Sequence, residues 1–268
     1  MRYLSFLLLI LVPILGVWTF VSADQNGWWF PVNVSSYGGE IDRLFNLILW
    51  MVGITFVGTE LLLAWFFFKY SRRRGDKAVF SHGNHKLEMV WTAVPAVLLL
   101  FIAFSQMGTW AQIKFARNFP AGEYSLERPI GELWASQFDW RTRYPGADGE
   151  LGTVDDFEHA FELVVPADTD VVFRLRSRDV IHSFFVPEFR LKQDALPGHT
   201  IPVWFRAGLR PEDAQRGESS YDLVCAELCG WGHYKMAGSV RVMRRDLFDA
   251  WMAETEAAWF SNGTEEVQ

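Results

Sequence analysis

The chain has 268 residues, of which 50% are apolar and 21% are charged. This composition is too apolar for an ordinary soluble enzyme and too charged for a channel that lies wholly in the membrane. Residues 1–110 hold 8 Lys and Arg against 6 Asp and Glu, whereas residues 111–268 hold 17 against 26, a net charge of −9. The acidic part argues against a nucleic-acid partner, whose phosphates it repels, and suits a basic protein partner. Two cysteines are too few for a disulfide scaffold.

The first residues follow the order of a secretory signal peptide. Arg2 precedes the apolar run 4–20, and Val21, Ser22 and Ala23 follow it as a small-residue cleavage site. We therefore expect residues 1–23 to be a signal peptide and the mature chain to begin at Asp24. The apolar run is also long enough for an uncleaved membrane anchor, which is the alternative.

Two further apolar runs, 44–68 and 89–110, each exceed the ~20 residues that cross a bilayer as a helix. They predict a transmembrane hairpin within residues 24–110. The loop between them is basic, and by the positive-inside rule it faces the cytoplasm. Its charged residues are Lys69, Arg72, Arg73, Arg74, Lys77 and Lys86, against Asp76. Both outer ends of the hairpin then lie outside the cytoplasm.

Two glutamates of the hairpin are functional candidates, because a carboxylate in the membrane is costly unless it faces protein or water. Glu60 lies inside the first span and Glu88 at the cytoplasmic end of the second. Glu60 either takes part in proton transfer or is a protonated or snorkelling side chain with no functional role. Glu88 is equally compatible with an ordinary helix-end charge.

After Trp110 the apolar residues come in short alternating stretches, which are typical of β-strands. The expected strands are 132–137, 140–144, 161–165, 171–175, 181–186, 189–192, 201–205, 221–224 and 239–243. Turn residues separate them, so we expect an all-β Greek-key sandwich over residues 111–260, closed by a helix at 246–260 and followed by a polar tail at 261–268. The acidic segment 147–156 lacks the aspartate spacing of an EF-hand and favours a hairpin turn.

One segment gathers residues that bind soft metals. It holds both cysteines, Cys225 and Cys229, together with His233 and Met236, and His182 lies on an earlier strand. Thiolate, thioether and imidazole ligands select copper, or zinc in a closed tetrahedral site. A disulfide, a structural zinc site and unrelated core residues are the alternatives, but the disulfide leaves His233 and Met236 unexplained, and zinc leaves Met236.

The loop Cys225-x-Glu227-x-Cys229-x3-His233-x2-Met236 resembles the copper loop of cytochrome c oxidase subunit II. The segments Asp179 to Pro187, Lys192 to Gly198 and Glu88 to Pro95 carry the same resemblance, which covers nearly the whole chain. It implies a cupredoxin-like domain and a binuclear CuA centre. In that centre Cys225 and Cys229 bridge two copper ions and His182 and His233 each bind one. Met236 and the backbone carbonyl of Glu227 are the weak axial ligands.

The resemblance also implies further sites and partners. The Glu227 carboxylate binds a magnesium ion shared with the catalytic subunit, and Glu88 lies at the entrance of a proton path. By the same resemblance we expect the chain to take electrons from a c-type cytochrome and to pass them to haem in subunit I, where oxygen is reduced to water and protons are pumped, with subunit III as a further partner. The resemblance implies a bacterial inner membrane with the β-domain on the periplasmic side. No Cys-x-x-Cys-His is present, so haem belongs to the partner alone.

The sequence departs from the family where electrons arrive. Many relatives have a tryptophan where this chain has Phe138, so Trp134, Trp140 and Trp231 are the candidates to take over electron uptake. Two other functions remain open. A nitric oxide reductase subunit shares the copper loop and differs in its partner, and a membrane-tethered copper carrier or sensor has no redox turnover.

Overall fold

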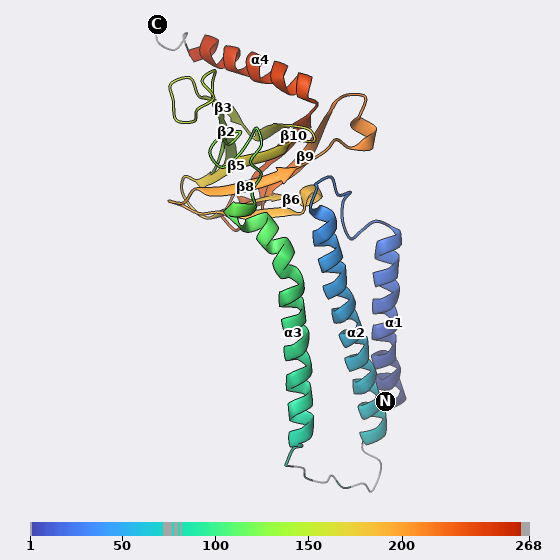
Figure 1. Cartoon of the computed structure of the whole chain (residues 1–268). Coiled ribbons are helices and arrows are strands. Elements are labelled where there is room, and N and C mark those ends of the chain that lie inside the picture. Colours follow the sequence, from blue (N-terminus) through green and yellow to red (C-terminus); the bar gives the residue numbers. More distant parts are fainter. Residues whose placement is uncertain (1, 72–76, 78–79, 81, 264–268) are drawn as a thin grey trace. The chain divides into compact units, whose positions relative to one another are not determined.

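The computed structural model describes residues 2–71, 77, 80 and 82–263 (Figure 1). The chain divides into two units. One comprises Met1–Trp29 with Asp42–Gly108, and the other comprises Phe30–Ile41 with Thr109–Gln268.

The first unit is helical. It is built from α1 (Arg2–Gln25), α2 (Gly38–Tyr70) and α3 (His85–Lys114), and all three helices are long and apolar enough to cross a membrane. The two expected apolar runs, 44–68 and 89–110, lie inside α2 and α3. The expected signal segment adds a third apolar helix to the two of the predicted hairpin. Arg72, Arg73, Arg74 and Asp76 of the basic loop lie outside the described residues.

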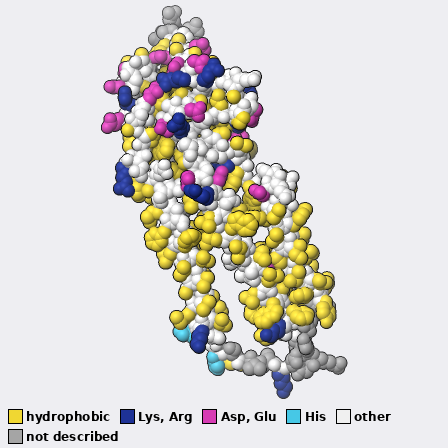
Figure 2. Space-filling model, turned by 45° about the vertical axis from the view of Figure 1, so that its right-hand side comes forward, with side chains coloured by type: hydrophobic (Ala, Val, Ile, Leu, Met, Phe, Trp, Pro, Cys, Tyr) yellow, Lys and Arg dark blue, Asp and Glu magenta, His cyan; other side chains and the backbone are white. Residues whose placement is uncertain are grey.

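Aromatic rings join α1 to α2. The ring centroids of Phe6 and Phe68 lie 5.1 Å apart, and those of Phe20 and Trp50 lie 5.5 Å apart. Among the side chains of this unit that the structure describes, only Pro13 and Ala64 are buried. Figure 2 shows apolar side chains covering the surface of the helices. Because lipid is as apolar as these side chains, the helices need no core of their own.

The second unit is a sandwich of two five-stranded sheets. The first sheet has the order β3-β2-β1-β5-β8 and the second β4-β10-β9-β6-β7. The strands are β1 (Glu132–Ser136), β2 (Asp139–Tyr144), β3 (Phe157–Ala160), β4 (Glu162–Pro166), β5 (Asp170–Ser177), β6 (His182–Val186), β7 (Leu191–Ala195), β8 (Ile201–Arg206), β9 (Glu218–Cys225) and β10 (Ala237–Met243). Parallel pairs, β1 with β5 and β4 with β10, occur among otherwise antiparallel neighbours. The predicted cupredoxin-like sandwich is confirmed.

Strand alternation builds the core between the sheets. In β2 the side chains of Trp140, Thr142 and Tyr144 are fully buried, whereas their neighbours are partly exposed. Phe173 of the first sheet and Phe184 of the second pack against each other beside Trp140 in the core, with their ring centroids 5.2 Å apart. The period of two in the sequence therefore fixes which face of each strand is apolar.

Some boundaries differ from the sequence prediction. Strand β3 was not expected, because Phe157–Ala160 holds one large apolar residue and its strand conformation comes from pairing with β2. The acidic segment 147–156 connects these two strands, as the predicted hairpin turn does. The closing helix α4 spans Arg245–Gly263. It therefore includes the first residues of the predicted tail, and residues 264–268 lie outside the described residues.

The segment before α2 packs on the sandwich. The backbone amide of Val34 donates to the Glu188 carbonyl oxygen at 3.1 Å, and the hydroxyl of Ser35 donates to the Phe189 carbonyl at 2.8 Å. The buried Tyr37 hydroxyl donates to the Trp204 carbonyl at 3.2 Å. These bonds make residues 30–41 part of the β unit.

Candidate metal centre

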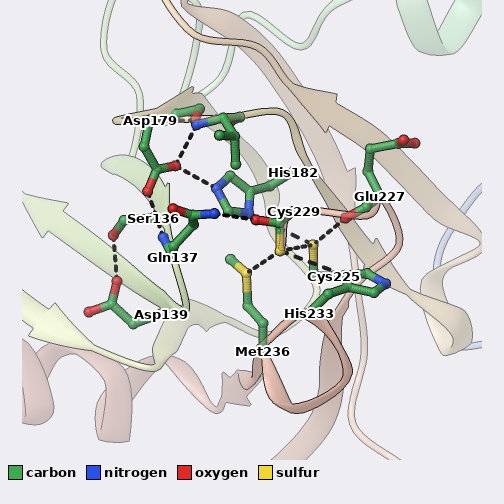
Figure 3. Close-up of polar contacts among 12 residues, drawn as sticks. Ser136, Gln137, Asp139, Asp179, His182, Cys225, Glu227, Cys229, His233 and Met236 are labelled. Carbon is green, nitrogen blue, oxygen red and sulfur yellow. Dashed lines mark hydrogen bonds and ion pairs between the residues drawn. The ribbon is translucent and has the colours of Figure 1, made fainter. Parts of the chain in front are cut away.

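Pairing between β6 and β9 assembles the cluster. Phe184 of β6 is opposite Cys225, the last residue of β9, so His182 at the start of β6 lies beside the loop that follows β9. Cys229 lies in that loop, His233 begins a short 3₁₀ turn, and Met236 immediately precedes β10. Figure 3 shows the five side chains converging on one point. Two neighbouring strands and one connection therefore supply all of them.

The two thiols form the middle of the cluster, with their Sγ atoms 3.8 Å apart. The Nδ1 atom of His182 lies 3.9 Å from the Cys225 Sγ, and the Nδ1 atom of His233 lies 3.6 Å from the Cys229 Sγ. The Glu227 carbonyl oxygen lies 3.2 Å from the Cys225 Sγ, and the Met236 Sδ lies 3.7 Å from the Cys229 Sγ. Each sulfur thus has one imidazole and one weaker donor beside it.

This donor set fits a pair of soft metal ions. His182, Cys225 and Cys229 are buried, and their ligand atoms all lie within 4.8 Å of one another. The cysteines are free thiols. A closed zinc site uses four ligands, whereas six donors converge here, and a thioether is a habitual ligand of copper. The arrangement therefore provides two similar half-sites that share two sulfurs.

Polar groups behind the ligands hold them in place. The Nε2 atom of His182 lies 2.7 Å from the Oδ1 atom of Asp179, which leaves Nδ1 directed at the sulfurs. The other carboxylate oxygen of Asp179 accepts the Gln137 backbone amide at 2.7 Å, and the Gln137 side-chain amide donates to the Cys229 carbonyl. A carboxylate that fixes the second nitrogen of a ligating histidine orients the ring and raises its basicity.

The same contacts set the protonation of the cluster. Burial alone would raise the pKa of Cys225, but hydrogen bonds with His182 and the backbone lower it to about 6. Burial and the neighbouring Cys225 sulfur raise the pKa of Cys229 to about 11. Burial works to lower the pKa of His182, but hydrogen bonds with Cys225 and Asp179 leave it raised. The surroundings therefore separate the two thiols, lowering the pKa of Cys225 and raising that of Cys229.

Other predicted site residues lie apart from this cluster or at its edge. The Glu227 side chain is exposed and extends away from the sulfurs, while its carbonyl faces Cys225 (Figure 3). Glu88 is in the first turn of α3, with its carboxylate 3.6 Å from the Nδ1 atom of His85. Glu60 lies within α2.

The three tryptophans differ in exposure. Trp140 is fully buried, with its ring centroid 6.4 Å from that of His182. Trp134 is half-buried beneath the guanidinium of Arg176, which lies 4.2 Å from its ring. Trp231, inside the loop that holds Cys229 and His233, is 77% exposed.

Sequence reasoning did not single out Asp179 and Gln137. Asp179 had a usable signal, because it precedes His182 by three residues in the segment that carried the resemblance. Gln137 precedes Phe138 in the segment where the sequence departs from the family, but no local pattern predicts its contact with Cys229, which spans 92 residues of chain.

The fold and the cluster define a class, a membrane-anchored cupredoxin-like domain with a soft-metal site. Comparison with known proteins identifies the family within this class. The family model for the cytochrome c oxidase subunit II transmembrane domain matches residues 23–108, and that for the periplasmic domain matches residues 138–243. The alternative cytochrome c oxidase subunit 2 of Bradyrhizobium diazoefficiens is 30% identical over 249 residues, which cover 85% of this chain and 83% of that protein.

The cytochrome c oxidase subunit 2 of Alkalihalophilus pseudofirmus is 30% identical over 252 residues, which cover 93% of this chain and 66% of that protein. Among solved structures, the periplasmic domain of subunit II of cytochrome oxidase from Bradyrhizobium japonicum is 25% identical, covers 48% of this chain and 94% of that one, and has a TM-score of 0.40. The chain belongs to the cytochrome c oxidase subunit II family. It is a membrane-anchored subunit of an oxidoreductase complex, with an extramembrane domain, and the resemblance seen in its sequence is confirmed.

Proposed function

We propose that this chain holds a binuclear copper centre. Cys225 and Cys229 would supply the thiolates that hold the two ions, and His182 and His233 would supply one imidazole each. Met236 and the Glu227 carbonyl would be the two weaker donors. The observation that carries the proposal is the pairing of the two sulfurs at 3.8 Å, each with its own imidazole nitrogen.

The centre is the point at which electrons enter the oxidase. A c-type cytochrome delivers them one at a time, and they continue to haem in subunit I, where oxygen is reduced to water and protons are pumped. When bound, the copper pair supplies a site whose single unpaired electron is shared between two nuclei. Sharing the charge keeps structural change on reduction small, which favours fast transfer.

The chain's own residues keep that change small as well. His182 is fixed by Asp179, and the Cys229 carbonyl is fixed by Gln137, so the ligands on both halves are tied to the β1–β2 turn. The fully buried Trp140 packs behind His182. A ligand whose rotamer is locked by packing and hydrogen bonds moves little when the charge of the site changes.

Two carboxylates have separate roles in the proposal. The exposed Glu227 side chain extends away from the sulfurs, which suits a magnesium ion at the contact with the catalytic subunit, because hard cations prefer carboxylate oxygen. Glu88 is half-exposed at the beginning of α3, where a proton path into the catalytic subunit would open.

The complex lies in a bacterial inner membrane, with the β-domain on the periplasmic side and subunits I and III as partners. We also propose that residues 1–23 are removed as a signal peptide; the match to the transmembrane family model begins at residue 23, after the apolar run 4–20. Copper loading outside the cytoplasm needs both cysteines reduced, because the thiolate is the metal ligand.

The decisive experiment is electron paramagnetic resonance of the purified, copper-loaded complex. We expect hyperfine structure from one unpaired electron shared equally by two copper nuclei, with uptake of oxygen rather than nitric oxide. A single-copper spectrum, or a centre that holds only zinc, would contradict the proposal.

A further inference from the structure

The copper loop exposes three large apolar side chains. Leu228 is 76% exposed, Trp231 is 77% exposed and Tyr234 is 84% exposed. They lie within seven residues of chain, in which Cys229 is buried, and the buried Met236 follows Tyr234 by two residues. We call Leu228, Trp231 and Tyr234 the apolar rim. Large exposed apolar side chains so close together in one loop, next to a candidate metal centre, favour a surface that another protein covers.

Trp231 is held in place although it is exposed. Its ring centroid lies 5.2 Å from that of Phe138, at an interplanar angle of 69°. Phe138 in turn packs on the glycines either side of Trp231, and a Cβ atom at Gly232 would come within 2.5 Å of the Phe138 ring. The ammonium of Lys235 lies 4.6 Å from the centre of the Trp231 ring. An exposed side chain that is held from both sides loses little conformational entropy when a partner binds.

Trp231 is also the candidate tryptophan that a donor can touch. Trp140 is fully buried, and Trp134 is covered by arginine. In the chain, Trp231 follows Cys229 by two residues and precedes His233 by two. A short path of covalent bonds therefore connects the exposed Trp231 ring to one cysteine and one histidine of the candidate metal centre.

We propose that Trp231 is the contact through which a one-electron donor delivers its electron, with the apolar rim as its docking surface. The donor is a small redox protein that carries its cofactor edge in an apolar surface and has net positive charge. The β-domain region 111–268, at net −9, attracts such a donor from a distance. The rim itself is apolar, so the final contact excludes water. This inference rests on the proposed function.

The transfer balances simply. The donor loses one electron and the metal centre gains it, no bond forms or breaks, and no proton moves. The Trp231 ring provides the path and is itself neither oxidised nor reduced.

The test compares Trp231→Ala with Trp231→Phe and the matched control Trp259→Ala in the purified complex. Trp259 is 44% exposed on α4 and lies outside the copper loop. The probe is a soluble c-type cytochrome. We expect Trp231→Ala to weaken its binding about tenfold or more, in copper-free and copper-loaded complex alike, because central aromatic anchors dominate such interfaces.

In the loaded complex Trp231→Ala should also slow rapid reduction of the centre by at least the same factor, with an unchanged paramagnetic resonance spectrum. Trp231→Phe should retain most of the donor binding and most of the rate of reduction, and Trp259→Ala should match the parent in both quantities. Parent-like binding and reduction in Trp231→Ala would overturn the inference, as would release of a partner subunit in place of weaker donor binding. Failure of the proposed function can be distinguished from failure of this inference, because the paramagnetic resonance spectrum of the parent complex would then show no paired copper.

Discussion

The two units of this chain differ in where their apolar side chains lie. In the helical unit only Pro13 and Ala64 are buried among the side chains described, whereas the β unit encloses a continuous aromatic and aliphatic core. The helices leave their apolar surface for lipid and partner subunits. The sandwich buries its apolar side chains in its own core, and this rigid core holds the candidate metal ligands. The difference predicts that equal truncations have unequal effects in the two units, and that the metal centre depends on the β unit alone.

The largest expected effect comes from removing a bridging sulfur. Cys229→Ser should abolish the paired copper signal, because Cys229 contacts Cys225, His233 and Met236 at once. The matched control Met236→Leu should keep two coppers and shift their reduction potential, since a weak ligand is lost and its volume is nearly kept. Copper stoichiometry and paramagnetic resonance measure both. Paired copper in Cys229→Ser would contradict the ligand assignment.

A core truncation comes next. Trp140→Ala should reduce the stability of the β unit by about 3–5 kcal/mol, because it opens a cavity beneath His182. The thermal midpoint of the strand circular dichroism signal, measured on the full chain in detergent, reports the loss. An unchanged midpoint would mean that the buried Trp140 ring adds nothing measurable to the stability of the sandwich.

A smaller effect concerns acid stability. Glu162 accepts hydrogen bonds from His159 and Ser239 and pairs with Arg241 at 3.1 Å, and the bond from His159 contributes most to holding its pKa below the ordinary value. A lowered native pKa means that this stability is present above the unfolded value of about 4.3 and is lost as the pH falls through the native value. Glu162→Gln should therefore flatten the fall in thermal midpoint below about pH 4.3. The same slope in both proteins would refute this.

The smallest effect is the helical counterpart of Trp140→Ala. Leu99 lies in α3, where no residue is buried, and it is 67% exposed within this chain. Leu99→Ala should change the thermal midpoint of the β unit by an amount equivalent to no more than about 0.5 kcal/mol. A shift as large as that of Trp140→Ala would show that the two units unfold as one.

The sequence predicted much of this protein because its signals are local. Apolar runs of sufficient length fix the membrane helices, and alternation fixes the apolar face of each strand. The predicted sandwich and the subunit II resemblance are confirmed, and the proposed ligands from Cys225 to Met236 lie within twelve residues. Strand β3 escaped prediction because its four residues gain strand conformation from pairing with β2, not from their own composition.

The sequence by itself determined the spans, the strand faces and the types of metal donor, since each follows from residue type and short-range spacing. The tertiary structure decided which donors meet: β6 pairs with β9 and brings His182 to Cys225, 43 residues away. It also decided that Asp179 and Gln137 hold the ligands and that Trp231 is exposed while Trp140 is buried. These outcomes depend on sheet register and packing, which bring residues that are far apart in the sequence into contact. No local sequence pattern predicts such contacts.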